Sequence, residues 1–158
     1  MSLLRTLILT AGISLPGACN SDLLGPGDMR ALAQAQAKWN VRGFADYSYE
    51  IKTLCFCPPE INQWARVSVR AGVVVDVQPV ETDPAWPITY QQWWQPIDSL
   101  FVNIHRHMTE SSFQSAYSAI IVTYDDALGY PTRIEYREKP NVADAGAIIT
   151  VRNVVPLN

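Results

Sequence analysis

The sequence predicts an α+β domain in which two helices pack on one face of an antiparallel sheet, in the order α-βββ-α-βββ. The first observation is that apolar and polar residues alternate, as on half-buried strands, in segments that form two groups of three. The second is that a pattern typical of a helix precedes each group. The connections between successive strands are short, which favours antiparallel pairing.

The first group follows a helix that is expected to have Asp28 as its N-cap and Gly43 just after its end. The first strand begins after Phe44. It stops at Pro58 and Pro59, because proline cannot donate a hydrogen bond to a neighbouring strand.

The clearest hairpin in the sequence joins Trp64–Arg70 to residues 73–77 through the dipeptide Ala71-Gly72. In the second of these strands, valines occupy alternate positions and are expected to face the core. They are Val73, Val75 and Val77.

The second group follows a helix that is expected to start at Pro96, since proline suits the first helical turn. The apolar residues of this helix recur at helical spacing and form one stripe: Ile97, Leu100, Phe101, Ile104 and Met108. Strands are expected at residues 119–124, 132–138 and 147–155.

The segment YDDALGYP, between the first two of these strands, is interpreted as a turn. Asp125 caps the turn, Gly129 permits a positive φ angle, and Pro131 restricts the exit. The carboxylates of Asp125 and Asp126 could instead suggest a calcium or catalytic site. We prefer the turn, because adjacent side chains at a strand end diverge.

The N-terminus has the layout of a secretory signal of the lipoprotein type over residues 1–18. Arg5 precedes a short apolar run, small residues follow, and Cys19 comes next. This resembles a bacterial lipobox, whose cysteine is acylated, although Pro16 departs from the pattern. An ordinary signal peptide is the alternative. We expect a tether over residues 19–27 and a single α+β domain over residues 28–158.

The composition indicates an exported, mildly acidic protein. The chain has 12 basic and 15 acidic side chains and a formal net charge of −3. Loss of residues 1–18 would change this charge to −4, because it removes the positive charge of Arg5. The basic residues are scattered along the sequence, so nucleic acid is not an expected partner. No apolar run approaches the roughly 20 residues of a spanning helix, so we expect no retained membrane span.

Four segments together resemble the DUF6174 family, a group of bacterial exported and lipoprotein-type proteins of unknown function. They are DYSYEIKTLCFCP, VSVRAGVVVDV, PIDSLF and VTYDDALGYPTRIEY, and they occur in the family's order. The resemblance covers residues 32–154, and CFCP and YD–GYP are its most specific parts. The family's acidic stretch before the last strand is poorly matched by NVADAGA. The resemblance implies export and a fold, and it implies no activity.

Cys55 and Cys57 lie one residue apart at the end of the first strand. On a regular strand their Cα atoms would be about 6.5–7 Å apart, at the upper limit for a disulfide. A bend before Pro58 could bring them closer. Three interpretations stay open: a local disulfide, two buried free thiols, or a thiol pair with a redox or metal role.

The loop between the two halves is rich in proline and aromatic residues and could contain a short helical turn at 89–94. Its aromatic residues are Trp86, Tyr90, Trp93 and Trp94. If they are exposed, they suit the binding of a ligand, a glycan or a protein. The alternative is that they close one end of the core.

The function expected from the sequence is that of a lipid-anchored envelope protein, held in the outer membrane through Cys19 or otherwise secreted. We expect a binding or structural role rather than an enzyme, with an envelope protein or a small ligand as partner and no cofactor. No metal site is expected, since His105 and His107 point to different faces of a helix. The alternative is a periplasmic thiol-redox or metal-handling protein that uses Cys55 and Cys57.

Overall fold

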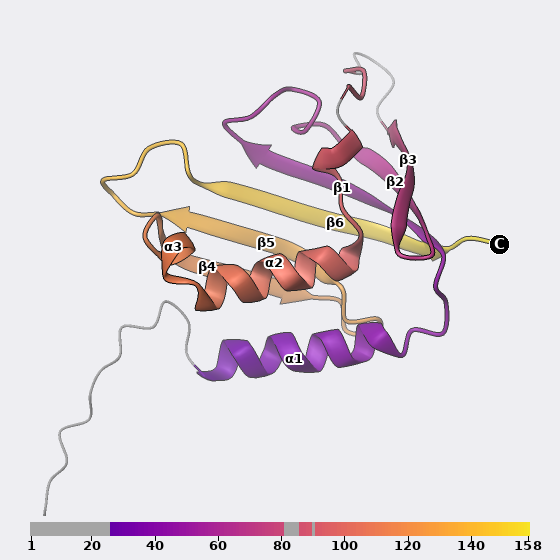
Figure 1. The fold of residues 1–158 in the computed structure, drawn as a ribbon, viewed down its shortest axis with the longest axis horizontal. Helices are drawn as coiled ribbons and strands as arrows, with labels where there is room; N and C mark the ends of the chain where they lie inside the picture. Colours follow the sequence, from indigo (N-terminus) through magenta and orange to yellow (C-terminus); the bar gives the residue numbers. More distant parts are fainter. Residues whose placement is uncertain (1–25, 81–85, 90) are drawn as a thin grey trace, which may run out of the picture.

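The computed structural model describes residues 26–80, 86–89 and 91–158 of the chain (Figure 1). The predicted signal peptide, Cys19 and Tyr90 lie outside these residues. The predicted tether does so too, apart from residues 26 and 27, which already belong to the first helix.

The described residues form one six-stranded antiparallel sheet with helices, which confirms the predicted α+β class. The strands are β1 (Tyr47–Cys55), β2 (Ala65–Arg70), β3 (Val73–Pro79), β4 (Tyr117–Tyr124), β5 (Pro131–Glu138) and β6 (Ala147–Pro156). Their order across the sheet is β3-β2-β1-β6-β5-β4. The first and last strands therefore pair at its centre (Figure 1). Glu50 of β1 stands opposite Arg152 of β6 in this pairing.

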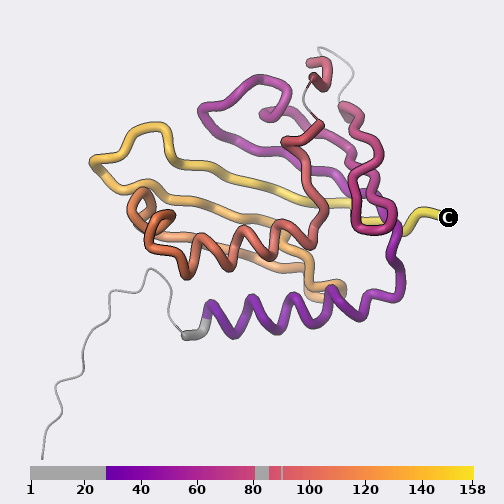
Figure 2. Tube along the Cα trace, in the orientation of Figure 1, coloured from indigo at the N-terminus to yellow at the C-terminus, as the bar shows by residue number. Residues whose placement is uncertain are grey.

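The helical segments are α1 (Pro26–Asn40), the 3-10 helix η1 (Gln91–Trp93), α2 (Ile97–Thr109) and the short α3 (Ser111–Gln114). All five residues of the predicted apolar stripe on α2 are buried, which confirms the periodicity. Figure 2 shows α1 and α2 running side by side, and the two helices are in contact.

The buried apolar strand residues lie on one side of the sheet, which we call the inner face. Tyr49, Val67 and Ile134 belong to it, and they share one hydrophobic core with the buried residues of α2. Trp39 of α1 is fully buried in the same core, and its ring meets the ring of Tyr47 edge-on at a centroid distance of 5.2 Å. The opposite side of the sheet is the outer face.

The hairpin of β2 and β3 corrects one expectation about the core. Val77 is buried as predicted, but the side chains of Val73 and Val75 are 63% and 51% exposed. The cause is an irregularity in the β2–β3 register, which pairs Val69 with Val74. An extra residue in one strand reverses the face of those beyond it. Val74 therefore replaces Val73 and Val75 against the core.

The β4–β5 turn has the structure expected of YDDALGYP. The Asp125 carboxylate accepts hydrogen bonds from the backbone N–H groups of Ala127 and Leu128, at 3.0 and 2.7 Å. Gly129 has φ of +81°, and a Cβ atom placed on it would lie 2.3 Å from the carbonyl oxygen of Ala35. The turn thus lies directly against α1, and only glycine fits there without a shift of the backbone.

Candidate functional site

The end of β1 forms a sharp corner at the CFC sequence. The strand ends at Cys55 and the chain bends at Phe56 and Cys57. The two cysteines are at disulfide distance, with their Cα atoms 5.2 Å apart. This separation is shorter than on a regular strand because the bend replaces the extended backbone.

Asn62 holds this corner in place. Its side-chain amide donates to the carbonyl oxygens of Cys55 and Cys57, at 3.3 and 3.1 Å, and its oxygen accepts the N–H of Cys55 at 3.1 Å. The Thr53 N–H also donates to the Ile61 carbonyl at 3.1 Å, so the loop after the prolines folds back onto the strand. The exposed corner therefore has a defined backbone rather than a loose one.

Two buried polar side chains then connect the corner to the segment after β3. Gln63 makes a pair of hydrogen bonds with the backbone of Trp86, accepting its N–H at 2.8 Å and donating to its carbonyl at 2.6 Å. The Glu60 carboxylate accepts the N–H of Thr89 at 2.6 Å. Gln63 and Glu60 are both almost fully buried. Trp86 is thereby fixed beside the loop that follows the CFC sequence, although it lies far from that loop along the chain.

The described members of the predicted aromatic cluster differ in exposure. Trp86 and Trp93 are 51% and 45% exposed, whereas Trp94 is 6% exposed and belongs to the core. Tyr90 lies outside the described residues. The two hydrogen bonds of Gln63 connect the backbone of Trp86 to the loop that follows the CFC sequence.

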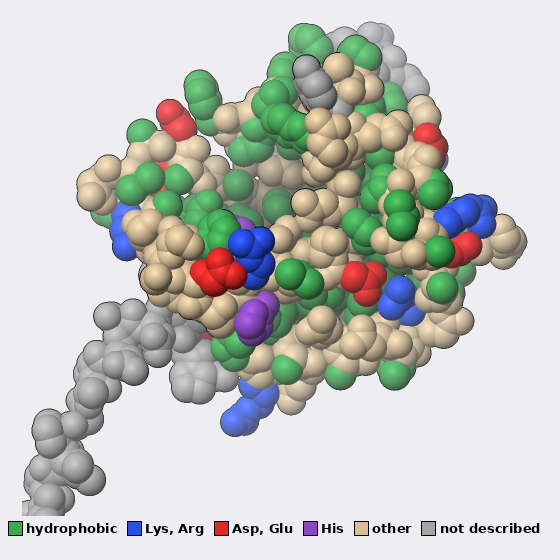
Figure 3. All heavy atoms as spheres, viewed as in Figure 1, with side chains coloured by type: hydrophobic (Ala, Val, Ile, Leu, Met, Phe, Trp, Pro, Cys, Tyr) green, Lys and Arg blue, Asp and Glu red, His purple; other side chains and the backbone are tan. Residues whose placement is uncertain are grey.

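Phe56 is the most exposed large apolar residue at the corner, with 85% of its surface accessible. Leu54, two residues earlier in β1, is half-exposed. Figure 3 shows hydrophobic side chains gathered at this end of the molecule, where the β1–β2 loop and residues 86–89 and 91–93 lie. We call the apolar surface made by Leu54, Phe56, Pro58, Pro59 and Trp86 the CFC corner.

Hollows border the CFC corner. One, of about 250 Å³, lies between Pro58, Pro59 and Trp86. A second, of about 520 Å³, is lined by Leu54 and Phe56 and by residues of β5 and β6. A third, of about 280 Å³, is lined by Cys55, Phe56, Cys57 and Pro58. The first is smaller than the roughly 300–1,000 Å³ typical of small-molecule sites, so it suits a single large side chain.

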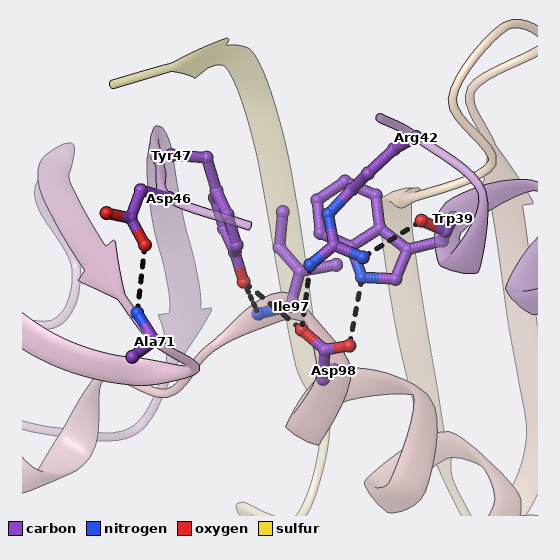
Figure 4. A network of polar contacts seen from close by, with 7 residues as sticks. All are labelled: Trp39, Arg42, Asp46, Tyr47, Ala71, Ile97 and Asp98. Carbon is purple, nitrogen blue, oxygen red and sulfur yellow. Dashed lines mark hydrogen bonds and ion pairs between the residues drawn. The ribbon is translucent and has the colours of Figure 1, made fainter. Parts of the chain in front are cut away.

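A separate polar cluster surrounds Asp98 at the start of α2 (Figure 4). Its carboxylate accepts hydrogen bonds from the indole N–H of Trp39 at 3.2 Å and from the hydroxyl of Tyr47 at 3.4 Å, and Arg42 lies 3.9 Å away. The Tyr47 hydroxyl also accepts the N–H of Ile97 at 3.0 Å. Burial raises the pKa of Tyr47, so its hydroxyl keeps the proton that it donates. This cluster joins α1, β1 and α2.

No group of three His, Cys, Asp or Glu side chains capable of holding a metal occurs among the described residues. His107 instead packs against the rings of Phe113, Tyr117 and Tyr136, and its Nδ1 lies 2.7 Å from the carbonyl oxygen of Asn103. Within the same residues, none of the helices has both the length and the apolar character needed to cross a bilayer.

Sequence reasoning identified Phe56 only as part of CFC and missed Asn62, Gln63 and Glu60. These three lie in EINQ, a segment without periodicity, and a polar residue in a loop gives no signal of its eventual partner. Comparison with known proteins adds one match. A family model described as a family of unknown function (DUF6174) matches residues 31–156. No curated protein and no solved structure matches the chain.

Proposed function

The chain belongs to the DUF6174 family, whose function is unknown, and we propose that it is a lipid-anchored envelope domain that docks a partner protein at the CFC corner. The observation that carries this proposal is Phe56, an aromatic side chain that is 85% exposed although its backbone is fixed. Exposed apolar surface of this kind commonly marks an interaction site.

The corner is suited to a protein partner for two reasons. Its backbone is ordered before binding by Asn62 and by the pairing of Cys55 with Cys57, which reduces the entropy lost on association. Phe56 also lines two hollows, one shared with β5 and β6 and one formed with Cys55, Cys57 and Pro58, so a partner could surround the ring. A separate hollow beside Pro58, Pro59 and Trp86 could take a side chain of the partner. Interlocking anchors of this kind dominate protein interfaces.

The alternative, a thiol-redox protein, uses the same pair of cysteines. One observation favours it: Cys55 and Cys57 are both only partly buried, so a thiol reagent could reach them. We prefer docking, because the contacts of Asn62 hold the corner in one conformation and the most exposed group there is an aromatic ring.

Phe56→Ala is expected to weaken capture of the partner at least about tenfold while leaving the free energy of unfolding nearly unchanged, because the ring is exposed. The measurement is chemical crosslinking in envelope preparations, followed by titration of the purified partner.

Val41→Ala is the matched control, since Val41 is an apolar residue of similar exposure, 81%, in the segment after α1. Equal capture by Phe56→Ala and Val41→Ala would show that the CFC corner is not the docking surface.

Lipid anchoring through Cys19 is tested independently. Cys19→Ala is expected to abolish incorporation of an alkyne-tagged fatty acid and to move the protein from the membrane to the soluble fraction, because a single acylated residue supplies the anchor. A Cys57→Ser variant should remain labelled. Unchanged fractionation of Cys19→Ala would contradict the anchor while leaving the docking proposal intact.

A further inference from the structure

The outer face of the sheet gathers basic residues that are scattered along the sequence. Its basic strand residues are half of the chain's 12: Lys52, Arg66, Arg70, Arg133, Arg137 and Arg152. Its acidic strand residues are Glu50, Asp76 and Glu135. With six basic and three acidic groups, the face carries a formal charge of +3, whereas the whole chain carries −3.

The strand register brings these residues together. Arg66, Glu50 and Arg152 stand side by side across β2, β1 and β6. Lys52 and Arg133 lie in the next row, on either side of Thr150. Directly paired residues share a face, and so do residues two apart on a strand. The charges therefore spread over four neighbouring strands as a two-dimensional array.

One acidic group, Glu50, is buried between two of the basic residues. Glu50 is 5% exposed and accepts hydrogen bonds from Arg66 at 2.8 Å and from Arg152 at 2.9 Å, while both guanidinium groups remain about half exposed. Burial by itself would raise the pKa of Glu50, but the hydrogen bonds from Arg66, Arg152 and Asn153 outweigh it and lower the pKa. Glu50 therefore stays ionised and orients two arginines toward solvent.

A second carboxylate repeats this arrangement. Glu135 pairs with Arg133 at 3.0 Å and with Arg137 at 2.6 Å, and these hydrogen bonds lower its pKa. Each of the two acids balances one of its two arginines, so each group keeps one net positive charge. At the margin, Arg70 is paired with Asp46, which lies just before β1.

Exposed apolar side chains lie among these charges. Leu54 and Ile121 stand in one row with Ile148 and Glu135, and both are exposed on the outer face. Val155, near the end of β6, is about half exposed as well. A surface that mixes cations with protruding apolar side chains is typical of proteins that lie on anionic membranes.

We propose that the outer face of the sheet is a second binding surface, which contacts a membrane through anionic phospholipid headgroups. A guanidinium group can bind two phosphate oxygens at once, and Glu50 and Glu135 position four such groups whose side chains remain about half exposed. Because the cationic groups form a two-dimensional array, they match the headgroups of a lipid surface better than they match the phosphates of a linear nucleic acid. This proposal does not depend on acylation of Cys19 or on the CFC corner as a docking site.

The test uses flotation of the full chain carrying Cys19→Ser, so that no acyl chain contributes. The vesicles consist of phosphatidylcholine alone or of phosphatidylcholine mixed with phosphatidylglycerol. We expect binding to the mixed vesicles to be at least about tenfold tighter, because each cation near an anionic surface strengthens the attraction. The preference should disappear at about 1 M salt, where charges are screened within roughly 3 Å.

The variant pair Lys52→Gln/Arg137→Gln is expected to remove most of this preference. The control Arg30→Gln/Arg106→Gln has the same change in charge at exposed positions on α1 and α2 and should retain it. Lys52→Gln alone provides a further variant, because no hydrogen bond or ion pair of Lys52 occurs within the described part of the chain. Its expected effect is a smaller loss in the same direction.

Three results would overturn the proposal. One is equal binding to both kinds of vesicle, and another is an equal loss in the test and control pairs. The third is tighter binding to a duplex oligonucleotide than to the mixed vesicles, which would assign the face to nucleic acid instead.

Discussion

Trp39→Ala is expected to lower the free energy of unfolding by about 3–5 kcal/mol, the cost typical of removing a fully buried tryptophan. The Trp39 side chain has no exposed surface, and its ring meets Tyr47 and Tyr130 edge-on. Its indole N–H donates to Asp98, and the Arg42 guanidinium lies 4.0 Å from the ring centroid. The change therefore leaves a cavity and removes a donor where α1, β1 and α2 meet.

Urea unfolding followed by far-UV circular dichroism measures this loss without relying on tryptophan fluorescence. Trp86→Ala is the control, with an expected change below about 1 kcal/mol, because about half of Trp86 is exposed and the hydrogen bonds from Gln63 are made to its backbone, which the substitution keeps. Trp39→Phe should lie between the two, since it keeps an aromatic ring and removes only the indole. Similar losses for Trp39→Ala and Trp86→Ala would contradict the assignment of Trp39 to the core.

Gly129→Ala is expected to cost about 2–5 kcal/mol, from the strain of a positive φ angle and from steric conflict with α1. The added Cβ would lie 2.3 Å from the Ala35 carbonyl oxygen and 2.8 Å from the Cβ of Lys38, so the turn and helix must move apart. The same urea titration reports this cost. A fall in the protection of the α1 amides against hydrogen exchange would show that the substitution destabilises this helix locally.

Gly72→Ala separates the two contributions. Gly72 has φ of +76°, close to the +81° of Gly129, but nothing lies within 4 Å of the position of its Cβ. We expect this control to lose only about 1–2 kcal/mol, the backbone cost alone. If Gly129→Ala and Gly72→Ala lowered the free energy of unfolding by the same amount, the result would contradict the close approach of α1 to the β4–β5 turn.

Local patterns in the sequence predicted much of the fold. The α2 stripe, including Phe101 and Ile104, follows from helical spacing, and the turn at Asp125 and Gly129 follows from its residue types. Proline placed the end of β1 at the CFC sequence. Each of these features depends on residues within a few positions of one another, so a single sequence contains the information.

The β3 valines show where local patterns stop being sufficient. Alternation predicts that Val73 and Val75 face the core, as they would on a regular strand. The prediction is wrong, because the irregularity in the β2–β3 register turns both side chains outward. Whether a bulge forms in β3 depends on how that strand pairs with β2 and packs against the core. The run of valines carries no sign of it.

Neighbouring residues specify periodicity and turn geometry, so the α+β class, the buried face of α2 and the β4–β5 turn could be predicted from local patterns. The pairing of β1 with β6, which places Glu50 beside Arg152 on the outer face, is visible only in the tertiary structure. Only the tertiary structure joins Gln63 to Trp86 at the CFC corner. These contacts link segments remote in the chain. Their partners are chosen by the packing of the whole domain, and local alternation leaves that choice open.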